Sequence, residues 1–434
     1  MKRLLAAVLA MVLLLSCTAC GAKNKEIEMP VENVTELTLW TYPYGNWSDS
    51  ETVNMLLNQF TSVYPNVRVT VEYLTEENAD EAVSTAIESG ETPDLIWTTP
   101  NRPMADWSGM GCMVDLSTLW NDNDRAEVLE ACQAACFTEE GECFLYPVAM
   151  NAYCMAINYD AFVQAEADKY IDLETRTWDD EDFINAVRAL YDTFHEPVAA
   201  VYCGGQADDY GTRALVSSLF GGSFTNEDHS GYAVDSEEML RALKLLMDMN
   251  GVIFDEALVG RDEALLFYLE NLKMSFCWDV QQQMNPAGMN NGVGVTKNGQ
   301  RIEYMFYPTS GGETSLPGEI WGLCAFNNGD EARLTIAKQF IRYFADGEGT
   351  ASAVRAAGSY PVRNTAEGND LTGIWSNNAV MSEYSVMLEA LGEDESVAPN
   401  WPVARSEWYK LLQRLAQDEV VLEDEVAAFM EAVK

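Results

Sequence analysis

Apolar residues recur with two different periods between residues 37 and 97. They alternate with polar residues at 37–41 and 67–73, and they recur every three or four positions at 53–64 and 79–87. A period of two is typical of a half-buried strand, and a period near 3.6 is typical of an amphipathic helix. Together with a short apolar run at 94–97, the pattern predicts strand, helix, strand, helix and strand.

This alternation predicts an α/β fold with a parallel, helix-covered sheet, because parallel neighbouring strands are joined by helical crossovers. In open sheets of this kind, ligands bind beyond the carboxyl ends of the strands. The segments after the first and third predicted strands, 40–47 and 97–102, are rich in aromatic and polar residues. Aromatic faces beside amides and hydroxyls suit a neutral polyol, so we expect both loops to face a ligand; burial of each Trp in the core is the alternative.

The rest of the chain continues to mix helical and strand patterns. No internal repeat or low-complexity linker separates domains, which favours domains built from interleaved segments. The elements expected here are a helix capped by Thr177, helices at 239–246 and 336–344, strands at 304–307 and 320–326, and an amphipathic helix over 407–434.

The composition is that of a globular protein with a strongly acidic surface. Of 434 residues, 48% are hydrophobic and 22% are charged, which excludes wholesale disorder. Asp and Glu number 69 against 26 Lys and Arg, so the formal net charge is -43. A surface this negative repels phosphate backbones, so nucleic acid is not an expected partner.

The first 20 residues have the layout of a secretory signal. Lys2 and Arg3 precede an apolar run at 4–15, which is shorter than the roughly 20 residues that span a bilayer. The small residues that follow lead to Cys20, and this stretch resembles the lipobox of bacterial lipoproteins. We expect Cys20 to be lipidated, with Cys17 or a plain cleaved signal as alternatives, and residues 21–35 to form a flexible tether.

Eight further cysteines, from Cys112 to Cys324, do not have the spacing of a zinc site. We expect them to be buried as small hydrophobic residues, with disulfide bonds as the second possibility. The Asn- and Asp-rich segment 121–124 lacks the spacing of a calcium loop and is expected to cap a helix. We expect no metal and no cofactor. Hydrolase and nucleotide-binding motifs are likewise missing from the sequence, so an enzyme is not expected.

Several segments, in their order and spacing, resemble the extracellular solute-binding proteins of ABC importers, specifically the sugar-binding group. The resemblance extends through most of the chain after the signal. The segments that carry it are 60–69, 89–95, 146–162, 177–179, 307–309, 317–326 and 358–363.

The resemblance implies a two-lobed periplasmic-binding-protein fold of type II, in which each lobe is a helix-covered, mainly parallel sheet and hinge strands join the lobes. Lobe 1 would combine 36–147 with 303–350, and lobe 2 would combine 148–302 with 351–434. The hinge crossings would fall near 146–150 and 301–309. Ligand would bind between the lobes and favour their closure.

Carried over position by position, the resemblance implies ligand contacts on the first and third-strand loops, just past the first hinge, and in later segments. For Trp321, burial in a strand is the alternative, and for Arg363 a structural salt bridge. The expected contacts are Trp40, Tyr42, Tyr44, Trp97, Asn101, Asn151, Tyr153, Trp278, Asp279, Trp321 and Arg363.

The sequence therefore predicts a monomeric binding protein, anchored by lipid on the extracytoplasmic face of the cell membrane, that captures a sugar or oligosaccharide and delivers it to ABC permease subunits. A cationic ligand such as a polyamine is the alternative that the acidic surface permits. A secreted glycan-degrading enzyme is the alternative from a different class of protein.

Overall fold

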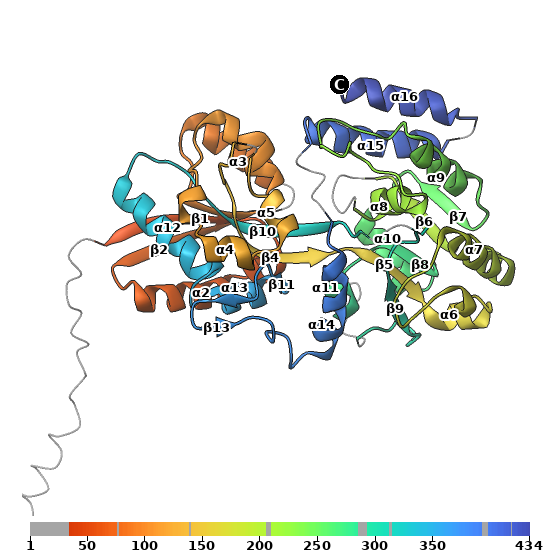
Figure 1. The fold of residues 1–434 in the computed structure, drawn as a ribbon, viewed down its shortest axis with the longest axis horizontal. Helices are drawn as coiled ribbons and strands as arrows, with labels where there is room; N and C mark the ends of the chain where they lie inside the picture. The colour runs from red at the N-terminus through yellow and green to blue at the C-terminus, as the bar shows by residue number, and fades with distance from the viewer. Residues whose placement is uncertain are drawn as a thin grey trace, which may run out of the picture.

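The computed structural model describes residues 34–75, 78–138, 140–204, 210–284, 293–311, 315–392, 398–417 and 419–434. Two lobes lie side by side, each with its own sheet and helices (Figure 1). The expected signal, the expected lipidation site Cys20 and most of the expected tether lie outside the described residues. Within the described part of the chain, no helix combines the length and apolar content needed to span a membrane.

The first lobe is built on a six-stranded sheet with the order β11-β4-β10-β3-β1-β2. Strand β1 pairs in parallel with both β2 and β3, as predicted, but β10 runs antiparallel to β3 and β4, and β11 runs antiparallel to β4. Three of the five pairings are antiparallel, so the expectation of a mainly parallel sheet is wrong for this lobe. Its strands are β1 (Thr35–Thr41), β2 (Val67–Tyr73), β3 (Leu95–Thr98), β4 (Tyr146–Ala152), β10 (Gly318–Ala325) and β11 (Tyr360–Pro361).

Local sequence explains the start of this lobe. The Asp49 side chain accepts a hydrogen bond from the Thr52 N–H at 2.7 Å and caps α2, and Gly90 ends α3 in the left-handed conformation with φ of 71°. The predicted strand–helix–strand–helix–strand order is confirmed. The helices of this lobe are α2 (Ser50–Val63), α3 (Ala79–Ser89), α4 (Asp122–Glu127), α5 (Glu130–Ala134), α12 (Glu331–Ala345) and α13 (Thr350–Ala357), with short turns η1 (Gly45–Ser48), η2 (Arg102–Trp107), η3 (Ser108–Met110) and η4 (Ser117–Leu119).

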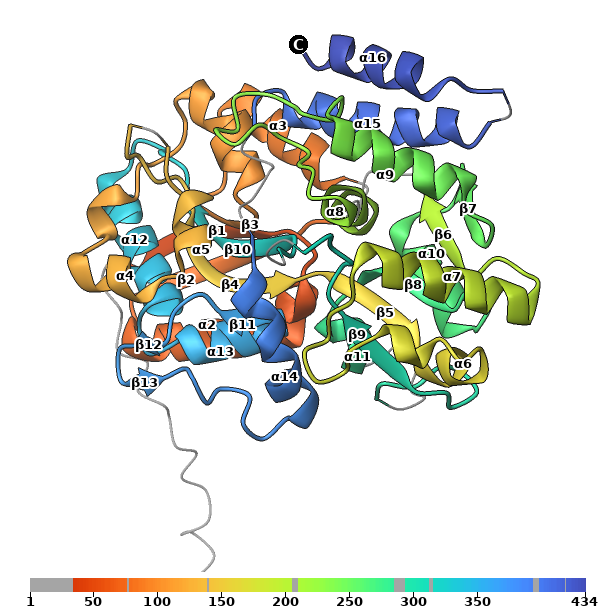
Figure 2. The same cartoon turned by 45° about the vertical axis from the view of Figure 1, so that its right-hand side comes forward.

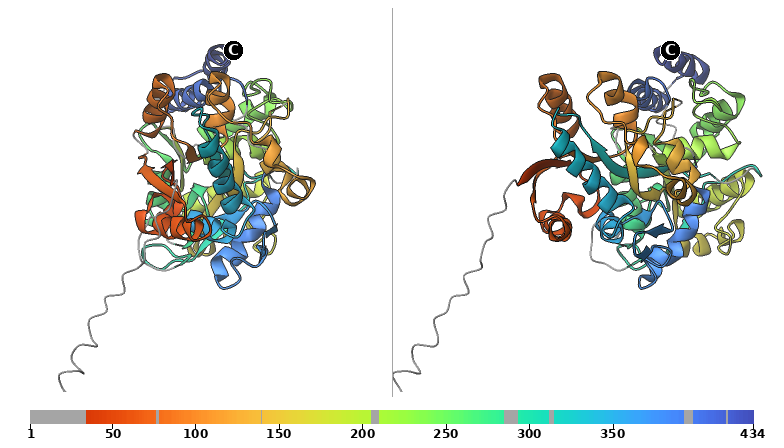
Figure 3. Two further views of the ribbon diagram at one scale, coloured as in Figure 1. Left: turned by 90° about the vertical axis from the view of Figure 1, so that its left-hand side faces the viewer. Right: turned by 60° about the vertical axis from the view of Figure 1, so that its left-hand side comes forward.

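Helix α12 packs along the sheet against β1, β4 and β10, as the turned views show (Figure 3). The Phe60 ring of α2 lies 4.9 Å from the Phe340 ring of α12, and Phe344 lies 4.8 Å from Phe340. These rings fill the space between the helices. The apolar stripes that predicted α2 and α12 are thus the surfaces that join them.

The second lobe contains a three-stranded sheet, β8-β5-β9, and a parallel pair, β6 and β7 (Figure 2). Both pairings of β5 are antiparallel. Its strands are β5 (Cys154–Asn158), β6 (Ala199–Tyr202), β7 (Val252–Asp255), β8 (Met274–Trp278) and β9 (Ile302–Met305); its helices are α6 (Tyr159–Gln164), α7 (Asp180–Phe194), α8 (Tyr210–Leu219), α9 (Glu237–Asp248), α10 (Gly260–Tyr268), α15 (Trp401–Leu415) and α16 (Leu422–Ala432), with η5 (Asp168–Tyr170).

The chain passes between the two sheets twice through extended segments, and it crosses a third time after β13 to reach α15. Strand β4 stays in the first sheet as far as Ala152, and β5 begins at Cys154 in the second sheet. Strand β9 pairs with β5, so the residues after 303 that we assigned to the first lobe begin in the second. Beside these crossings lie α11 (Val280–Met284), α14 (Ala379–Tyr384) and η7 (Ser385–Ala390), and after β11 comes the small hairpin of β12 (Thr365–Ala366) and β13 (Asn369–Asp370).

Helix α13 and strand β11 also differ from the predicted division. Helix α13 packs against α2 and β4, and β11 extends the first sheet, so the chain beyond residue 350 still contributes to the first lobe. The lobe to which a strand or helix belongs depends on the elements it packs against, and for α13 and β11 these elements are far away in sequence. The exact division of the chain into lobes otherwise stays a prediction.

Two helix boundaries differ from the sequence analysis. The N-cap of α7 is Asp179, whose carboxylate accepts from the Asp182 N–H at 2.8 Å, and Thr177 lies before it. The expected single helix over 407–434 is two helices, α15 and α16, separated by a turn in which Glu419 has φ of 63°. Folding back lets α15 and α16 bury their apolar stripes against each other.

Two other sequence expectations are confirmed. None of the eight cysteines from Cys112 to Cys324, all within the described residues, forms a disulfide bond; Cys112 is half-buried and the others are buried. Asn121 caps α4, because its side chain accepts from the N–H groups of Asn123 and Asp124 while Asp124 bonds back to the N–H of Asn121. This reciprocal cap accounts for the acidic segment without a metal ion.

Candidate ligand-binding cleft

A cavity of about 490 Å³ opens between the two lobes. The loops after β1 and β3 form one wall together with the start of α3, so the two loops that we expected at one rim do meet there. The opposite wall comes from α8, the start of α11 and α15. The side chains that line it include Tyr42, Tyr44, Asp80, Asn101, Arg102, Tyr153, Tyr210, Asp279, Gln281, Glu319, Trp321 and Arg405.

On the first-lobe wall, Asp80 accepts two hydrogen bonds. The Tyr42 hydroxyl and Arg102 Nε each donate to its Oδ1 at 2.8 Å, and the Arg102 guanidinium lies 4.0 Å from the centre of the Tyr42 ring. Burial raises the pKa of Asp80, but the charges of Arg102 and Arg405 and these hydrogen bonds outweigh it and lower the pKa. Burial raises the pKa of Tyr42, which stays a neutral donor. This wall therefore presents a fixed group of oriented polar atoms.

A column of aromatic rings runs from the cavity into the first lobe. Tyr44 stacks on Trp321 with ring centres 4.1 Å apart, Trp321 lies 6.0 Å from Trp97, and Trp97 stacks on Trp47 at 4.2 Å. The Tyr44 hydroxyl is 2.7 Å from the Ser359 hydroxyl, and Trp321 Nε1 donates to Glu319 at 3.1 Å. Because these contacts hold Tyr44 and Trp321 on several sides, their orientation in the wall is defined before any ligand arrives.

The cavity also carries negative charge near the crossing strands. Burial, followed by the charges of Glu319 and Asp279, raises the pKa of Tyr44 well above its usual value. Asp279 accepts from the Asn151 side-chain amide at 3.1 Å and from the Gln282 N–H at 2.9 Å. Opposite, Tyr153 stacks on Tyr210 with ring centres 4.7 Å apart. Two aromatic pairs and the carboxylates of Asp279 and Glu319 thus lie around this part of the cavity.

The structure brings six of the predicted contacts to this cavity from segments far apart in the chain. They come from both loops of the first lobe, from the hinge and from the second lobe. They are Tyr42, Tyr44, Asn101, Tyr153, Asp279 and Trp321.

Two predicted aromatic contacts are not on the cavity wall: one points to the opposite face of the sheet, and the other is covered by neighbouring rings. Trp40 alternates with the buried Leu39 and Thr41, and its half-buried ring lines a different hollow, beside Pro93 and Arg333. Trp97 is fully buried between Trp47 and Trp321. The expectation that these two indoles face a ligand is corrected: one lies on the far face of the sheet and the other in the core.

Trp278 and Arg363 also have internal partners. The Trp278 ring is fully buried edge-on against Phe267, and its Nε1 donates to Gln283 at 3.0 Å. Arg363 is 4% exposed and forms an ion pair with Asp124 at 2.9 Å, which is the structural salt bridge that we named as its alternative. Neither side chain lines the cavity, so the sequence-based expectation was wrong for both.

Asn151 takes an intermediate position. It is fully buried and does not line the cavity, but its amide donates to Asp279, which does. Asn151 Oδ1 has no hydrogen-bond partner among the described residues. Asn151 therefore orients the carboxylate of Asp279 from behind.

Comparison with known proteins agrees with this geometry. The model of a family described as bacterial extracellular solute-binding proteins matches residues 55–381, about three quarters of the chain. The chain belongs to this family. A comparison with curated protein sequences finds no match.

Solved structures of solute-binding proteins share the two-lobed fold over nearly their whole length. The GacH receptor of Streptomyces glaucescens, solved unliganded and with acarbose, has 14% identity and a TM-score of 0.69, covering 93% of this chain and 100% of its own. The cyclic α-maltosyl-1,6-maltose-binding protein of Arthrobacter globiformis has 16% identity, a TM-score of 0.70 and coverage of 92% and 98%. Maltose-bound MalE3 of T. maritima has 16% identity, a TM-score of 0.68 and coverage of 91% and 98%.

Several residues of the cleft of this solute-binding protein were not predicted from the sequence. Arg102 directly follows Asn101, and Asp80 is the second residue of the helix after the second strand. The rule that ligands bind beyond the carboxyl ends of the strands could therefore have found both. The remaining residues approach from the second lobe, and only the folded chain brings them there: Tyr210, Gln281 and Arg405. Glu319 lies two residues before Trp321 on the same strand face.

No group of three or more His, Cys, Asp or Glu side chains arranged to hold a metal ion occurs in the described ranges. The carboxylates of the cleft are engaged instead by arginine, tyrosine, tryptophan or amide donors. The chemistry that this arrangement offers is recognition by stacking and hydrogen bonding.

Proposed function

We propose that this protein captures a sugar or oligosaccharide between its lobes and presents it to the permease of an ABC importer. The observation that carries the proposal is a single cavity lined by both lobes, in which aromatic rings alternate with amide, carboxylate and guanidinium groups. The C–H faces of a pyranose pack on aromatic rings, while its hydroxyls bond to polar groups around them. Similar structures solved with acarbose and with maltose support this ligand class.

Binding would act through closure of the lobes. Tyr44 and Trp321 belong to the first lobe and Tyr210 and Asp279 to the second, so a ligand that contacts all four favours the conformation in which both walls are close. A ligand can shift the population only by its difference in affinity for the two states. The closed protein is then the form that a permease would distinguish from the empty one.

Calorimetric titration against maltose, cellobiose, xylobiose and their longer oligomers tests the proposal. We expect Tyr44→Ala and Asp279→Asn each to weaken the preferred saccharide at least about tenfold, which is roughly 1.4 kcal/mol. Tyr159→Ala, which removes a second-lobe ring packed on Arg301, is the matched control and should leave affinity unchanged. If no saccharide binds, or if both cleft variants retain full affinity, the proposed function is wrong.

The same titration includes spermidine and putrescine, because the carboxylates of Asp279 and Glu319 favour a cation as well. Polyamine binding without saccharide binding would replace the proposed ligand class. Incubation of oligosaccharides with the protein, followed by chromatography, addresses the enzyme alternative. We expect no cleavage product, because the family consists of binding proteins.

We further propose that the mature protein is a monomer held at the outer face of the cell membrane by a lipid on Cys20. The support is the basic, apolar and small-residue order that precedes this cysteine. Cys20→Ser should release the protein from the membrane fraction, whereas Cys17→Ser should not. Retention of the Cys20→Ser variant would contradict this anchor.

A further inference from the structure

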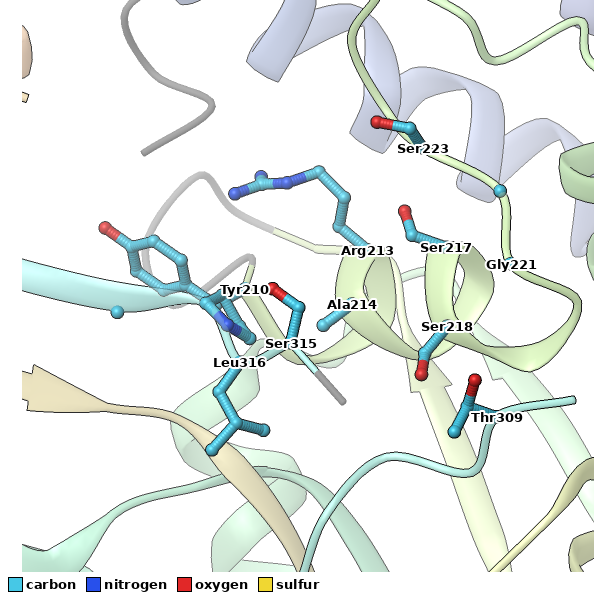
Figure 4. A pocket seen from close by; sticks show the side chains of 13 residues that line it. Tyr210, Arg213, Ala214, Ser217, Ser218, Gly221, Ser223, Thr309, Ser315 and Leu316 are labelled. Atoms are coloured by element: carbon cyan, nitrogen blue, oxygen red, sulfur yellow. The ribbon is translucent and has the colours of Figure 1, made fainter. Parts of the chain in front are cut away.

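Two of the cavities outside the cleft differ in their relation to it. One, with a volume of about 430 Å³, lies beside α8, and Tyr210 lines both this cavity and the cleft (Figure 4). Binding there is therefore not independent of the cleft. The other, which we call the Trp40 hollow, has a volume of about 560 Å³, and none of the described residues that line it lines the cleft. Its walls include Trp40, Ile87, Glu91, Pro93, Asn327 and Arg333.

The Trp40 hollow is built by the first lobe alone. Its described residues come from β1, from α3 and the segment after it, from the segments after η3 and β10, and from α12. Asp80 of the cleft lies at the start of α3 and Gly90 of the hollow just after its end, so a rise of about 1.5 Å per residue separates the two sites by roughly 15 Å. A site built by one lobe keeps its shape whether the lobes are open or closed.

A buried carboxylate ties the walls of the hollow together. Asp94 is 3% exposed and accepts from the Thr38 N–H at 2.7 Å and from the Asn328 amide at 3.2 Å, and Arg333 also donates to it. The Asn328 amide lies 3.2 Å from the Pro93 carbonyl oxygen as well. These bonds connect β1, the segment before β3, the loop after β10 and α12, so the walls are in place before any ligand arrives.

Trp40 is the one aromatic side chain among the described residues that line the hollow. Its ring is half-buried, and Ile87 and Pro93 line the hollow with it. The indole N–H forms no hydrogen bond with any residue in the described part of the chain. The ring therefore provides an apolar surface with a hydrogen-bond donor at its edge.

Polar groups border this ring. Glu91 and Asn327 are exposed, and Arg333 is partly exposed and forms an ion pair with Asp94. Asn327 Oδ1 accepts from the Gly329 N–H at 3.1 Å, and the NH₂ group of this amide has no hydrogen-bond partner in the described ranges. Glu91 and Arg333 are the charged side chains among the described lining residues, and their charges are opposite. This balance suits hydroxyl groups better than an ion.

We propose that the Trp40 hollow is a second saccharide site, in which a sugar unit packs on the Trp40 ring and its hydroxyls bond to Glu91, Asn327 and the indole N–H. A volume of about 560 Å³ is in the range of small-molecule sites. Because one lobe builds the site, a saccharide bound there has the same affinity for the open and closed protein and does not favour closure. The inference goes beyond the proposed function and does not require binding in the cleft.

The indole N–H of Trp40 reports occupancy directly. In ¹H–¹⁵N spectra of the labelled protein, which has 11 tryptophans, Trp40→Phe identifies the Trp40 signal by its disappearance, and Trp321→Phe identifies a signal of the cleft. Maltose, cellobiose and xylobiose are each titrated to about 20 mM, which saturates a site of millimolar affinity. We expect at least one of them to shift the Trp40 signal saturably.

Two comparisons separate the hollow from the cleft. In the unaltered protein, the Trp40 signal should saturate at a concentration at least about tenfold higher than the Trp321 signal, because the closed cleft contacts its ligand from two lobes. In Tyr44→Ala, which disables the cleft, the shift of Trp40 should persist with an unchanged dissociation constant.

Glu91→Gln should weaken the binding that the Trp40 signal reports by about fivefold, because a charge-assisted hydrogen bond becomes a neutral one. Glu88→Gln is the matched control: it removes an exposed carboxylate of α3 that lines neither cavity. Equal dissociation constants for the two variants would overturn the placement of the sugar between Trp40 and Glu91.

The result for the hollow is distinguishable from that for the cleft. If no disaccharide shifts the Trp40 signal, the inference is overturned, while calorimetric binding in the cleft would still support the proposed function. A Trp40 shift with the same dissociation constant as the Trp321 shift also overturns it, because the change would then be transmitted from the cleft. That comparison uses the unaltered protein, so it decides the matter even if Tyr44→Ala does not fold.

Discussion

At the scale of single residues, Trp97 and Trp321 show how little separates a core ring from a cleft ring. They lie on neighbouring strands with ring centres 6.0 Å apart, but Trp97 is paired with Leu323, two residues further along β10 than Trp321. Residues two apart on a strand share a face. Trp321 and Leu323 therefore point to the same face of β10. Trp321 lines the cavity, and Tyr44 stacks on it there.

Because Trp97 is buried, Trp97→Ala should act on stability. We expect the free energy of unfolding to fall by about 3–5 kcal/mol, since the cavity left by a large aromatic ring cannot collapse fully. Urea denaturation followed by far-UV circular dichroism measures this. Tyr44→Ala, at the cavity end of the same ring column, should lower stability less and ligand affinity more. Equal stability losses for the two variants would contradict the assignment.

Glu263 predicts a pH dependence. It is fully buried on α10 and accepts hydrogen bonds from Ser275 Oγ at 2.6 Å and the Phe276 N–H at 2.8 Å, yet burial outweighs these bonds and raises its pKa to about 8. The folded protein thus binds a proton that the unfolded chain has released, so this group lowers stability as pH rises from about 4.5 to about 8.

Glu263→Gln should remove that part of the pH dependence. Urea denaturation at pH 5, 6.5 and 8 measures the unfolding free energy of both proteins. The value for the variant minus the value for the unaltered protein should increase as pH rises. Glu238→Gln, at the exposed start of α9, should leave the difference constant. A variant that runs parallel to the unaltered protein across this range would show that Glu263 is ionised throughout.

At the scale of elements, the loop after β1 is held against α13. Gly45 has φ of 52°, and a Cβ there would lie 2.3 Å from the carbonyl oxygen of Ala357, the last residue of α13. The neighbouring Trp47 Nε1 donates to the Ala353 carbonyl at 3.2 Å. The close backbone approach, available only to glycine, places Tyr44 in the cavity wall.

Gly45→Ala should therefore lower both stability and ligand affinity. The clash adds to the cost of the left-handed conformation, which alone is about 1 kcal/mol. Gly90→Ala is the control: it has φ of 71° but open space where the Cβ would lie, so it should lower the melting temperature less and leave affinity unchanged. Similar melting temperatures for the two variants would show that α13 moves to accommodate the methyl group.

At the scale of the whole molecule, extended segments connect two lobes that share one cavity. Buried tyrosines bond to the backbone at these crossings: the Tyr307 hydroxyl donates to the Phe276 carbonyl at 2.7 Å, and the Tyr384 hydroxyl donates to the Ala152 carbonyl at 3.1 Å. Such contacts favour rotation of whole lobes about the crossings over deformation inside either lobe.

Small-angle X-ray scattering should detect this closure as a decrease in the radius of gyration when a saturating saccharide is added. Asp279→Asn, measured at the same saccharide concentration, should show a smaller decrease, because a smaller fraction of the variant is occupied. A radius of gyration that is unchanged by a ligand proven to bind would contradict the closure mechanism.

The sequence alone determined the elements that depend on neighbours along the chain. Period, caps and stops are local properties, so β1 to β3, α2 and α3 were predicted with near-correct ends. The rule for the carboxyl ends of parallel strands then placed the loops of Tyr42 and Asn101 at one rim. The resemblance to a known family supplied the two-lobed architecture.

Only the tertiary structure decided which side chains face the cavity and which strands belong to which sheet. Trp40 lies on the far face of the sheet, and Trp97 is in the core because Trp47 and Trp321, which are distant in sequence, cover its ring. Strand β9 joins the second sheet and β10 runs antiparallel in the first because each pairs with strands that are distant in sequence. Tyr210 and Arg405 reach the cleft only when the second lobe stands opposite the first, an arrangement set by contacts between residues far apart in sequence, which no local pattern records.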